Sequence, residues 1–144
     1  MKNLWITAAL VVGAATSAWA QLSVGYHQSN LPLIAVGYEL GERFLPELRF
    51  AANINVSDGY YTELALNYQL LNRPDYEFYT GLGLGLYTGY YATDAALVVP
   101  LGLNLFPFER KRFGFHMEVA PQIDTDHFKL LRGSWGIRYR FLPD

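Results

Sequence analysis

Residues 113–123 read Phe-Gly-Phe-His-Met-Glu-Val-Ala-Pro-Gln-Ile, so every second side chain is apolar and those between them are small or polar. Successive side chains of a β-strand point to opposite faces. A period of two therefore predicts a strand with one apolar and one polar face. The polar face of this segment carries His116, Glu118 and Gln122. After Gln21, no helical period extends over three turns, which favours an all-β chain.

The same alternation occurs eight times after Gln21 and predicts eight strands. These are Leu22–Gln28, Leu33–Leu40, Leu45–Val56, Tyr61–Leu71, Glu77–Tyr90, Ala95–Phe106, Phe113–Ile123 and Lys129–Phe141. Turn-forming residues separate them, for example Ser57-Asp58-Gly59 and Asn72-Arg73-Pro74-Asp75. Because every connection is short, consecutive strands are expected to pair as antiparallel hairpins in an up-and-down order.

The first twenty residues predict a secretory signal peptide. Lys2 is followed by the apolar run Leu4–Ala15 and by Ala18-Trp19-Ala20, a small-x-small cleavage pattern before Gln21. The apolar run is shorter than the roughly 20 residues that a membrane-spanning helix needs. We therefore expect residues 1–20 to be a signal peptide and residues 21–144 to form a single exported domain.

The polar faces of the predicted strands carry balanced charges. Their glutamates are Glu39, Glu47, Glu63 and Glu118, and their arginines are Arg49, Arg132, Arg138 and Arg140. Glycine and alanine fill most positions between them, which makes room for long side chains inside a narrow barrel. Only Lys111 and Lys129 follow the first twenty residues, although lysine is common on strand faces in water. Since buried charges persist when they are paired, we interpret the polar face as the interior.

An apolar exterior predicts a barrel that spans a membrane. Eight tilted strands of roughly 9–11 residues fit the chain and leave short turns, and closure is required because hydrocarbon cannot satisfy an open strand edge. Aromatic residues near the predicted strand ends are expected to form girdles: Tyr60, Tyr61, Tyr76, Tyr90, Tyr91, Phe106, Phe108 and Phe113. The predicted fold is an eight-stranded antiparallel up-and-down transmembrane β-barrel with a polar interior. A soluble lipocalin-like barrel is the alternative.

The last strand carries a resemblance to a known family. Ser134, Gly136, Tyr139 and Phe141 resemble the C-terminal β-signal of outer-membrane barrels, and Leu142-Pro143-Asp144 follow the final aromatic. With eight strands, residues 21–144 are similar to the small OmpA/OmpX-type membrane barrels. The resemblance implies a bacterial outer-membrane location, contact with outer-membrane lipid and insertion by the barrel-assembly machinery.

The composition excludes several classes of function. The chain has 144 residues, no cysteine and a net charge of −2. It therefore has no disulfide, no thiolate metal site and no cysteine nucleophile. Near-neutral charge gives no basic stripe for nucleic acid. Gly81-Leu-Gly83-Leu-Gly85 is predicted to be the glycine-lined inner face of a strand, since no helix follows it. We expect no cofactor.

Two groups of residues could carry chemistry. His116, Glu118 and Ser134 are predicted to face inward, and a Ser–His–Glu relay is conceivable because some barrels of the resembled family modify the acyl chains of lipid A. A lipid substrate would lie outside the barrel, however, so an interior hydrogen-bond network is the better interpretation. Scattered histidines and the acidic turn Asp124-Thr125-Asp126-His127 do not predict a metal site.

The sequence predicts a structural or accessory role more than a specific activity. Eight strands enclose an interior that side chains just fill, so we expect no wide pore. The alternatives are a narrow, porin-like channel for small solutes or ions and a lipid-modifying enzyme. If Arg138 is buried and paired, replacing it with leucine should destabilise the fold by about 3 kcal/mol or more.

Overall fold

The computed structural model describes residues 22–51, 59–89, 91–124 and 128–142. The predicted signal peptide and the acidic turn at 125–127 lie outside the described residues. Within the described residues the strands are β1 (Leu22–Gln28), β2 (Leu33–Tyr38), β3 (Phe44–Ala51), β4 (Tyr60–Asn72), β5 (Tyr76–Thr88), β6 (Thr93–Val98), β7 (Leu101–Leu105), β8 (Phe113–Asp124) and β9 (Phe128–Arg140). In this part of the chain no helix is both long and apolar enough to cross a membrane.

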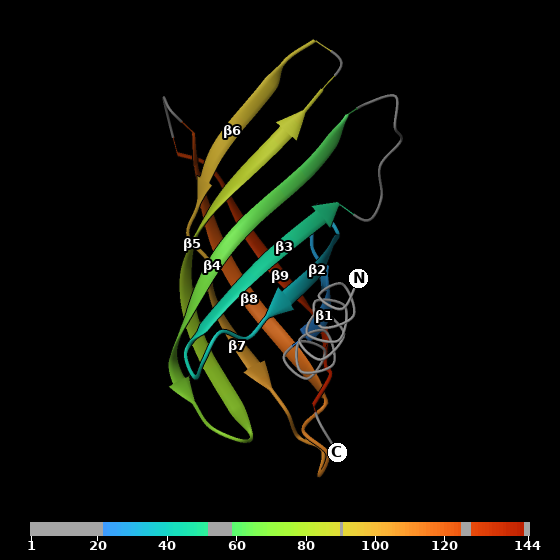
Figure 1. The fold of residues 1–144 in the computed structure, drawn as a ribbon. Helices are drawn as coiled ribbons and strands as arrows, with labels where there is room; N and C mark the ends of the chain where they lie inside the picture. Colours follow the sequence, from blue (N-terminus) through green and yellow to red (C-terminus); the bar gives the residue numbers. More distant parts are fainter. Residues whose placement is uncertain (1–21, 52–58, 90, 125–127, 143–144) are drawn as a thin grey trace, which may run out of the picture.

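These strands close into an eight-stranded antiparallel barrel (Figure 1). The order around the wall is β4-β3-β2-β1-β9-β8, then β6 and β7 together, then β5, which pairs back with β4. The first and last strands are adjacent, with Val24 opposite Tyr139. The predicted up-and-down fold is confirmed.

The prediction of one continuous strand over Ala95–Phe106 is wrong, because the structure interrupts it. It divides at Val99-Pro100 into β6 and β7, and both parts pair with β5 and β8, so together they form one position in the wall. Proline has no N–H to donate to the sheet. The Pro100 carbonyl instead accepts a hydrogen bond from the Gly81 N–H (3.0 Å), and the Val99 N–H donates to the Pro121 carbonyl (3.0 Å).

The register staggers the strands around the barrel. The cross-strand partners of Tyr26 can be followed around the barrel in both directions until they reach β5. Through β9, β8 and β7 they lead to Tyr76, and through β2, β3 and β4 they lead to Leu86. The two positions are ten residues apart along β5. A stagger of this size requires tilted strands, which carry side chains from distant turns to the same level of the interior.

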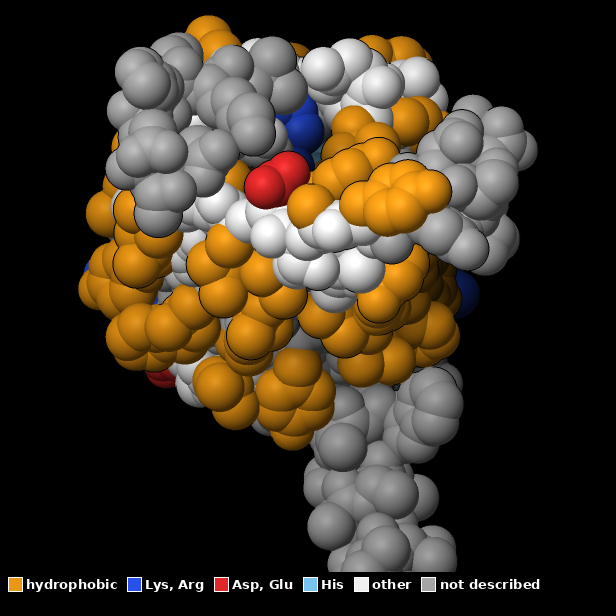
Figure 2. Space-filling view, turned by 90° about the horizontal axis from the view of Figure 1, so that it is seen from above, with side chains coloured by type: hydrophobic (Ala, Val, Ile, Leu, Met, Phe, Trp, Pro, Cys, Tyr) orange, Lys and Arg blue, Asp and Glu red, His pale blue; other side chains and the backbone are white. Residues whose placement is uncertain are grey.

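The barrel is polar inside and apolar outside. Arg49 and Glu63 are completely buried, whereas Leu64 is 60% exposed and Trp135 is 64% exposed. Seen from one end of the barrel, apolar side chains cover much of the visible wall (Figure 2). This inverts the usual arrangement of a soluble protein, and it agrees with the predicted orientation of the two faces.

Candidate functional site

The interior is organised around Arg49, which β3 places at the centre of the barrel. Its guanidinium group donates to three carboxylates from three strands. Nη1 lies 2.9 Å from Glu63 Oε1 and 2.8 Å from Glu118 Oε1, and Nη2 lies 2.7 Å from Glu118 Oε2. Nε and Nη2 both contact Glu47 Oε2, at 2.9 and 2.7 Å. Glu47 and Arg49 share a face because they are two residues apart on one strand.

Two further arginines complete this group. Arg132 of β9 donates to Glu63 Oε2 at 2.7 Å and contacts Glu118 Oε1 at 3.4 Å. Arg138 of the same strand donates to Glu47. We call these six residues the central cluster: Glu47, Arg49, Glu63, Glu118, Arg132 and Arg138. Three acids face three bases, so the buried charges compensate one another, as buried ion pairs require.

Two tyrosines extend the central cluster. Tyr79 Oη donates to Glu118 Oε2 at 2.7 Å, and Tyr61 Oη donates to Glu63 Oε2 at 2.7 Å. A glycine on a neighbouring strand leaves room for each ring: Gly102 is opposite Tyr79, and Gly85 is opposite Glu63, two residues from Tyr61. A Cβ on Gly102 would collide with Tyr79, and one on Gly85 would collide with Tyr61. Gly85 and Gly102 therefore provide the space that the two tyrosine rings occupy.

A second cluster lies toward the end of the barrel that carries the described chain ends, Leu22 and Leu142. Arg140 Nη1 lies 2.6 Å from Glu77 Oε1 and 3.9 Å from Glu39 Oε1. Its guanidinium carbon lies 3.6 Å from the ring centroid of Phe106, and Asn104 Nδ2 donates to Glu77 at 3.1 Å. Burial, together with the negative charge of Glu77, raises the pKa of Glu39 above its ordinary value.

The predicted interior residues thus separate into two groups. Glu47, Arg49, Glu63, Glu118, Arg132 and Arg138 meet in the central cluster, while Glu39 and Arg140 lie in the second cluster. Glu39 is partly exposed and follows the end of β2. His116 joins neither group through a hydrogen bond or an ion pair among the described residues.

Sequence reasoning missed some interior residues. Glu77 is a fifth inward-facing glutamate, and Tyr79 also lies inside. Tyr61 and Phe106 were expected in the aromatic girdles, and this expectation is wrong because both are buried in the interior. The alternation could have placed Tyr61 inside the barrel, because Tyr61 lies two residues before the inward-facing Glu63 and therefore shares its face.

The histidines do not form a catalytic or metal site in the described structure. The rings of His27 and His116 contact each other at a tilt of 47°, with centroids 3.9 Å apart. Their nitrogens, and the Ser134 hydroxyl oxygen, have no hydrogen-bond partner within the described ranges. Ser134 is therefore not hydrogen-bonded to His116, as a Ser–His–Glu relay requires. No group of three or more acidic or histidine side chains in the same ranges is arranged to hold a metal.

The residues of the proposed β-signal lie on both faces of β9 and just beyond it. Ser134 and Gly136 face the interior, with Gly136 tightly enclosed by the Tyr26 backbone and the His116 ring. Tyr139 and Phe141 point outward and contact each other edge to face, with ring centroids 5.0 Å apart. This arrangement leaves an aromatic pair on the outer surface at the end of the barrel.

An eight-stranded antiparallel barrel with a polar interior and an apolar exterior is the fold that small outer-membrane barrels have. Solved structures share this fold. The N-terminal β-barrel domain of Pseudomonas aeruginosa OprF is similar over 82% of this chain and 93% of that chain, with 15% sequence identity and a TM-score of 0.61.

Two other solved structures are similar to this chain. Neisserial surface protein A (NspA) is 15% identical, with 83% of this chain and 92% of that chain covered and a TM-score of 0.49. Ail, the attachment invasion locus protein of Yersinia pestis, is 18% identical, with 83% of this chain and 95% of that chain covered and a TM-score of 0.42. No protein-family model and no curated protein matches the sequence. The likeness to the OprF barrel shows a shared fold and does not extend to function.

Proposed function

We propose that the protein is an integral component of a bacterial outer membrane, with a structural or accessory role, no enzymatic activity and no wide pore. The observation that carries this proposal is the contrast between the fully buried Arg49 and an exterior rich in exposed leucine. In water such a surface would expose a large apolar area, whereas hydrocarbon would cover it favourably.

The dimensions of the barrel support this location. The long strands have 12 or 13 residues. A strand of this length rises about 40 Å, and at a tilt of about 40° it spans about 30 Å, which is the thickness of a bilayer's hydrocarbon core. The outward-facing aromatic pair at the end of β9 supports insertion by the barrel-assembly machinery, which is the partner we propose.

Location is tested by membrane fractionation and gel migration. The chain should enter the outer-membrane fraction, and it should migrate differently on a gel before and after boiling, because a folded barrel is more compact than the boiled chain. If the protein stays in the soluble fraction and its migration does not change on boiling, the proposal is wrong.

Burial of the central cluster argues against the channel alternative. The side chains of Arg49, Glu63 and Glu118 have no exposed area, so a water-sized sphere cannot reach them. An open path through this level would have to wet these charges. We expect no single-channel steps in planar bilayers, and regular steps would contradict the proposed sealed interior.

The enzyme alternative is disfavoured by the positions of its candidate residues. Ser134 is buried inside the barrel and does not hydrogen-bond to His116. A lipid substrate would meet the outer wall, where these groups do not point. Lipid A incubated with the purified protein should keep its acyl chains, and a change in acyl content would contradict this part of the proposal.

A further inference from the structure

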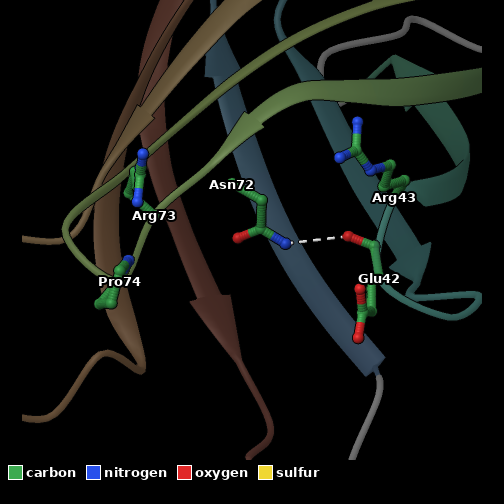
Figure 3. Close-up of a pocket in the computed structure, with 5 residues that line it drawn as sticks. All are labelled: Glu42, Arg43, Asn72, Arg73 and Pro74. Atoms are coloured by element: carbon green, nitrogen blue, oxygen red, sulfur yellow. Dashed lines mark hydrogen bonds between the residues drawn. The ribbon is translucent and has the colours of Figure 1, made fainter.

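A hollow of about 420 Å³ lies between two turns at the end of the barrel that carries Leu22 and Leu142 (Figure 3). It is lined by Glu42 and Arg43 from the turn between β2 and β3, and by Asn72, Arg73 and Pro74 at the turn between β4 and β5. In Figure 3 the two arginines lie on either side of Asn72. The hollow thus combines two cations and one carboxylate from turns that are far apart in sequence.

Hydrogen bonds hold the two turns together. Asn72 Nδ2 donates to the Glu42 carbonyl oxygen at 2.9 Å (Figure 3), and the Gln69 N–H donates to the Arg43 carbonyl oxygen at 2.8 Å. Within the turn between β4 and β5, the Arg73 N–H donates to the Tyr76 carbonyl oxygen at 2.9 Å. These bonds use backbone and amide groups, so they fix the hollow without using the charged side chains that line it.

The charged groups of the hollow are available to a ligand. Asp75, the acid next to this site, is paired with Lys111 at 2.5 Å and therefore does not neutralise Arg73. Neither Arg73 nor the Glu42 carboxylate forms an ion pair with any described residue. Arg43 donates a hydrogen bond to a neutral group, the Tyr68 hydroxyl, at 3.2 Å, and its guanidinium carbon lies 5.9 Å from the centroid of the same ring.

Aromatic side chains on the barrel wall locate the hollow relative to a membrane. Phe44 and Tyr68 form an edge-to-face pair, with ring centroids 5.2 Å apart, and Tyr76 is also exposed. Aromatic girdles lie at the boundary between hydrocarbon and headgroups. Because Arg43 immediately precedes Phe44, the proposed membrane location would place the hollow at the level of the lipid phosphates. Two exposed leucines, Leu40 and Leu71, lie close in the sequence to the lining residues Glu42 and Asn72.

We propose that this hollow binds the headgroup of a zwitterionic phospholipid that carries a primary ammonium group. Arg43 and Arg73 bind the phosphodiester, for which the guanidinium group is well suited. The Glu42 carboxylate accepts hydrogen bonds from the ammonium, and the acyl chains lie on the outer wall. This inference rests on the proposed membrane location, because it assigns the apolar wall to lipid.

Lipid binding to the full chain in detergent tests this inference. Native mass spectrometry would compare phosphatidylethanolamine, phosphatidylcholine and phosphatidylglycerol with identical acyl chains. We expect preferential binding of phosphatidylethanolamine, because the trimethylammonium of phosphatidylcholine cannot donate a hydrogen bond and phosphatidylglycerol has no cation. Equal binding of all three lipids would overturn the proposal.

Variants identify the residues responsible. Arg73→Gln should weaken binding of phosphatidylethanolamine about fivefold, the effect expected of one arginine near a lipid phosphate. Glu42→Gln should remove the preference over phosphatidylglycerol. Arg110→Gln, which removes an exposed charge from the turn between β7 and β8, is the matched control and should change binding less than twofold. If Arg73→Gln and Arg110→Gln behave alike, the hollow is not the site.

Two controls separate the sources of failure. Inorganic phosphate at millimolar concentration should not displace the lipid, and displacement by inorganic phosphate would assign the hollow to a soluble anion instead. Heat-modifiable migration of the same samples shows whether the barrel is folded. A folded, membrane-inserted barrel without lipid preference contradicts this inference alone, whereas a chain that never enters membranes contradicts the proposed function.

Discussion

Replacing Arg49 with methionine should destabilise the barrel strongly. Arg49 donates to Glu47, Glu63 and Glu118, and after its removal Arg138 and Arg132 still compensate two of the three negative charges. One buried carboxylate is left without a positive partner. Methionine retains much of the buried volume, so we expect a loss of about 3–5 kcal/mol, the cost of breaking a buried ion pair from one side.

The assay is urea unfolding in detergent micelles, followed by the gel migration of unboiled samples. A double variant, Arg49→Met with Glu118→Gln, isolates the electrostatic cause because it leaves two glutamates facing two arginines. It should recover at least about 2 kcal/mol relative to Arg49→Met. Arg110→Met, which removes an exposed cation, should stay within about 0.5 kcal/mol of the wild type.

The result that would refute this reasoning is a double variant no more stable than Arg49→Met. In that case the loss would come from packing around the side chain and not from an uncompensated charge. An unchanged urea midpoint for Arg49→Met alone would refute it more simply, because the central cluster would then make no measurable contribution to stability.

Three further predictions follow from the interior. Arg138→Leu removes one of the two arginines that contact Glu47 and should cost about 3 kcal/mol in the same urea assay. An unchanged urea midpoint would count against the pairing of Arg138 with Glu47. Gly102→Ala places a methyl group against the Tyr79 ring and should cost about 1–3 kcal/mol; full stability would mean that the ring has space to move. Burial raises the pKa of Glu39, so ionisation of this group costs more in the folded state than in the unfolded chain. Stability should therefore fall as the pH rises above the carboxyl's ordinary pKa, and Glu39→Gln should reduce that fall, whereas parallel pH profiles would contradict it.

Most of the strand positions could be predicted from the alternation, because a half-buried strand repeats every two residues whichever face is buried. The first predicted strand, Leu22–Gln28, agrees with β1 at both ends. Scarcity of lysine also indicated the orientation of the faces, as did the near balance of arginine and glutamate on the polar face, where Glu77 adds one glutamate to the predicted set. These signals are local in the sequence, and local signals are sufficient to place strands.

Contacts across the barrel could not be predicted from the same pattern. Arg49 and Glu118 are 69 residues apart, and their meeting depends on the stagger of every strand between them. Alternation leaves this register open, because a shift of two residues preserves the faces. Residue type was also misleading at Phe106, where an aromatic expected at the membrane boundary instead packs against Arg140 inside the barrel.

The central claim, that apolar side chains face lipid, is tested most directly by the fluorescence of Trp135. This residue points outward from β9 and is the only tryptophan after Gln21. In vesicles containing the protein from Gln21 to Asp144, we predict blue-shifted emission that lipids brominated on their acyl chains quench and aqueous iodide does not. Red-shifted emission quenched by iodide and unaffected by brominated lipid would contradict the account.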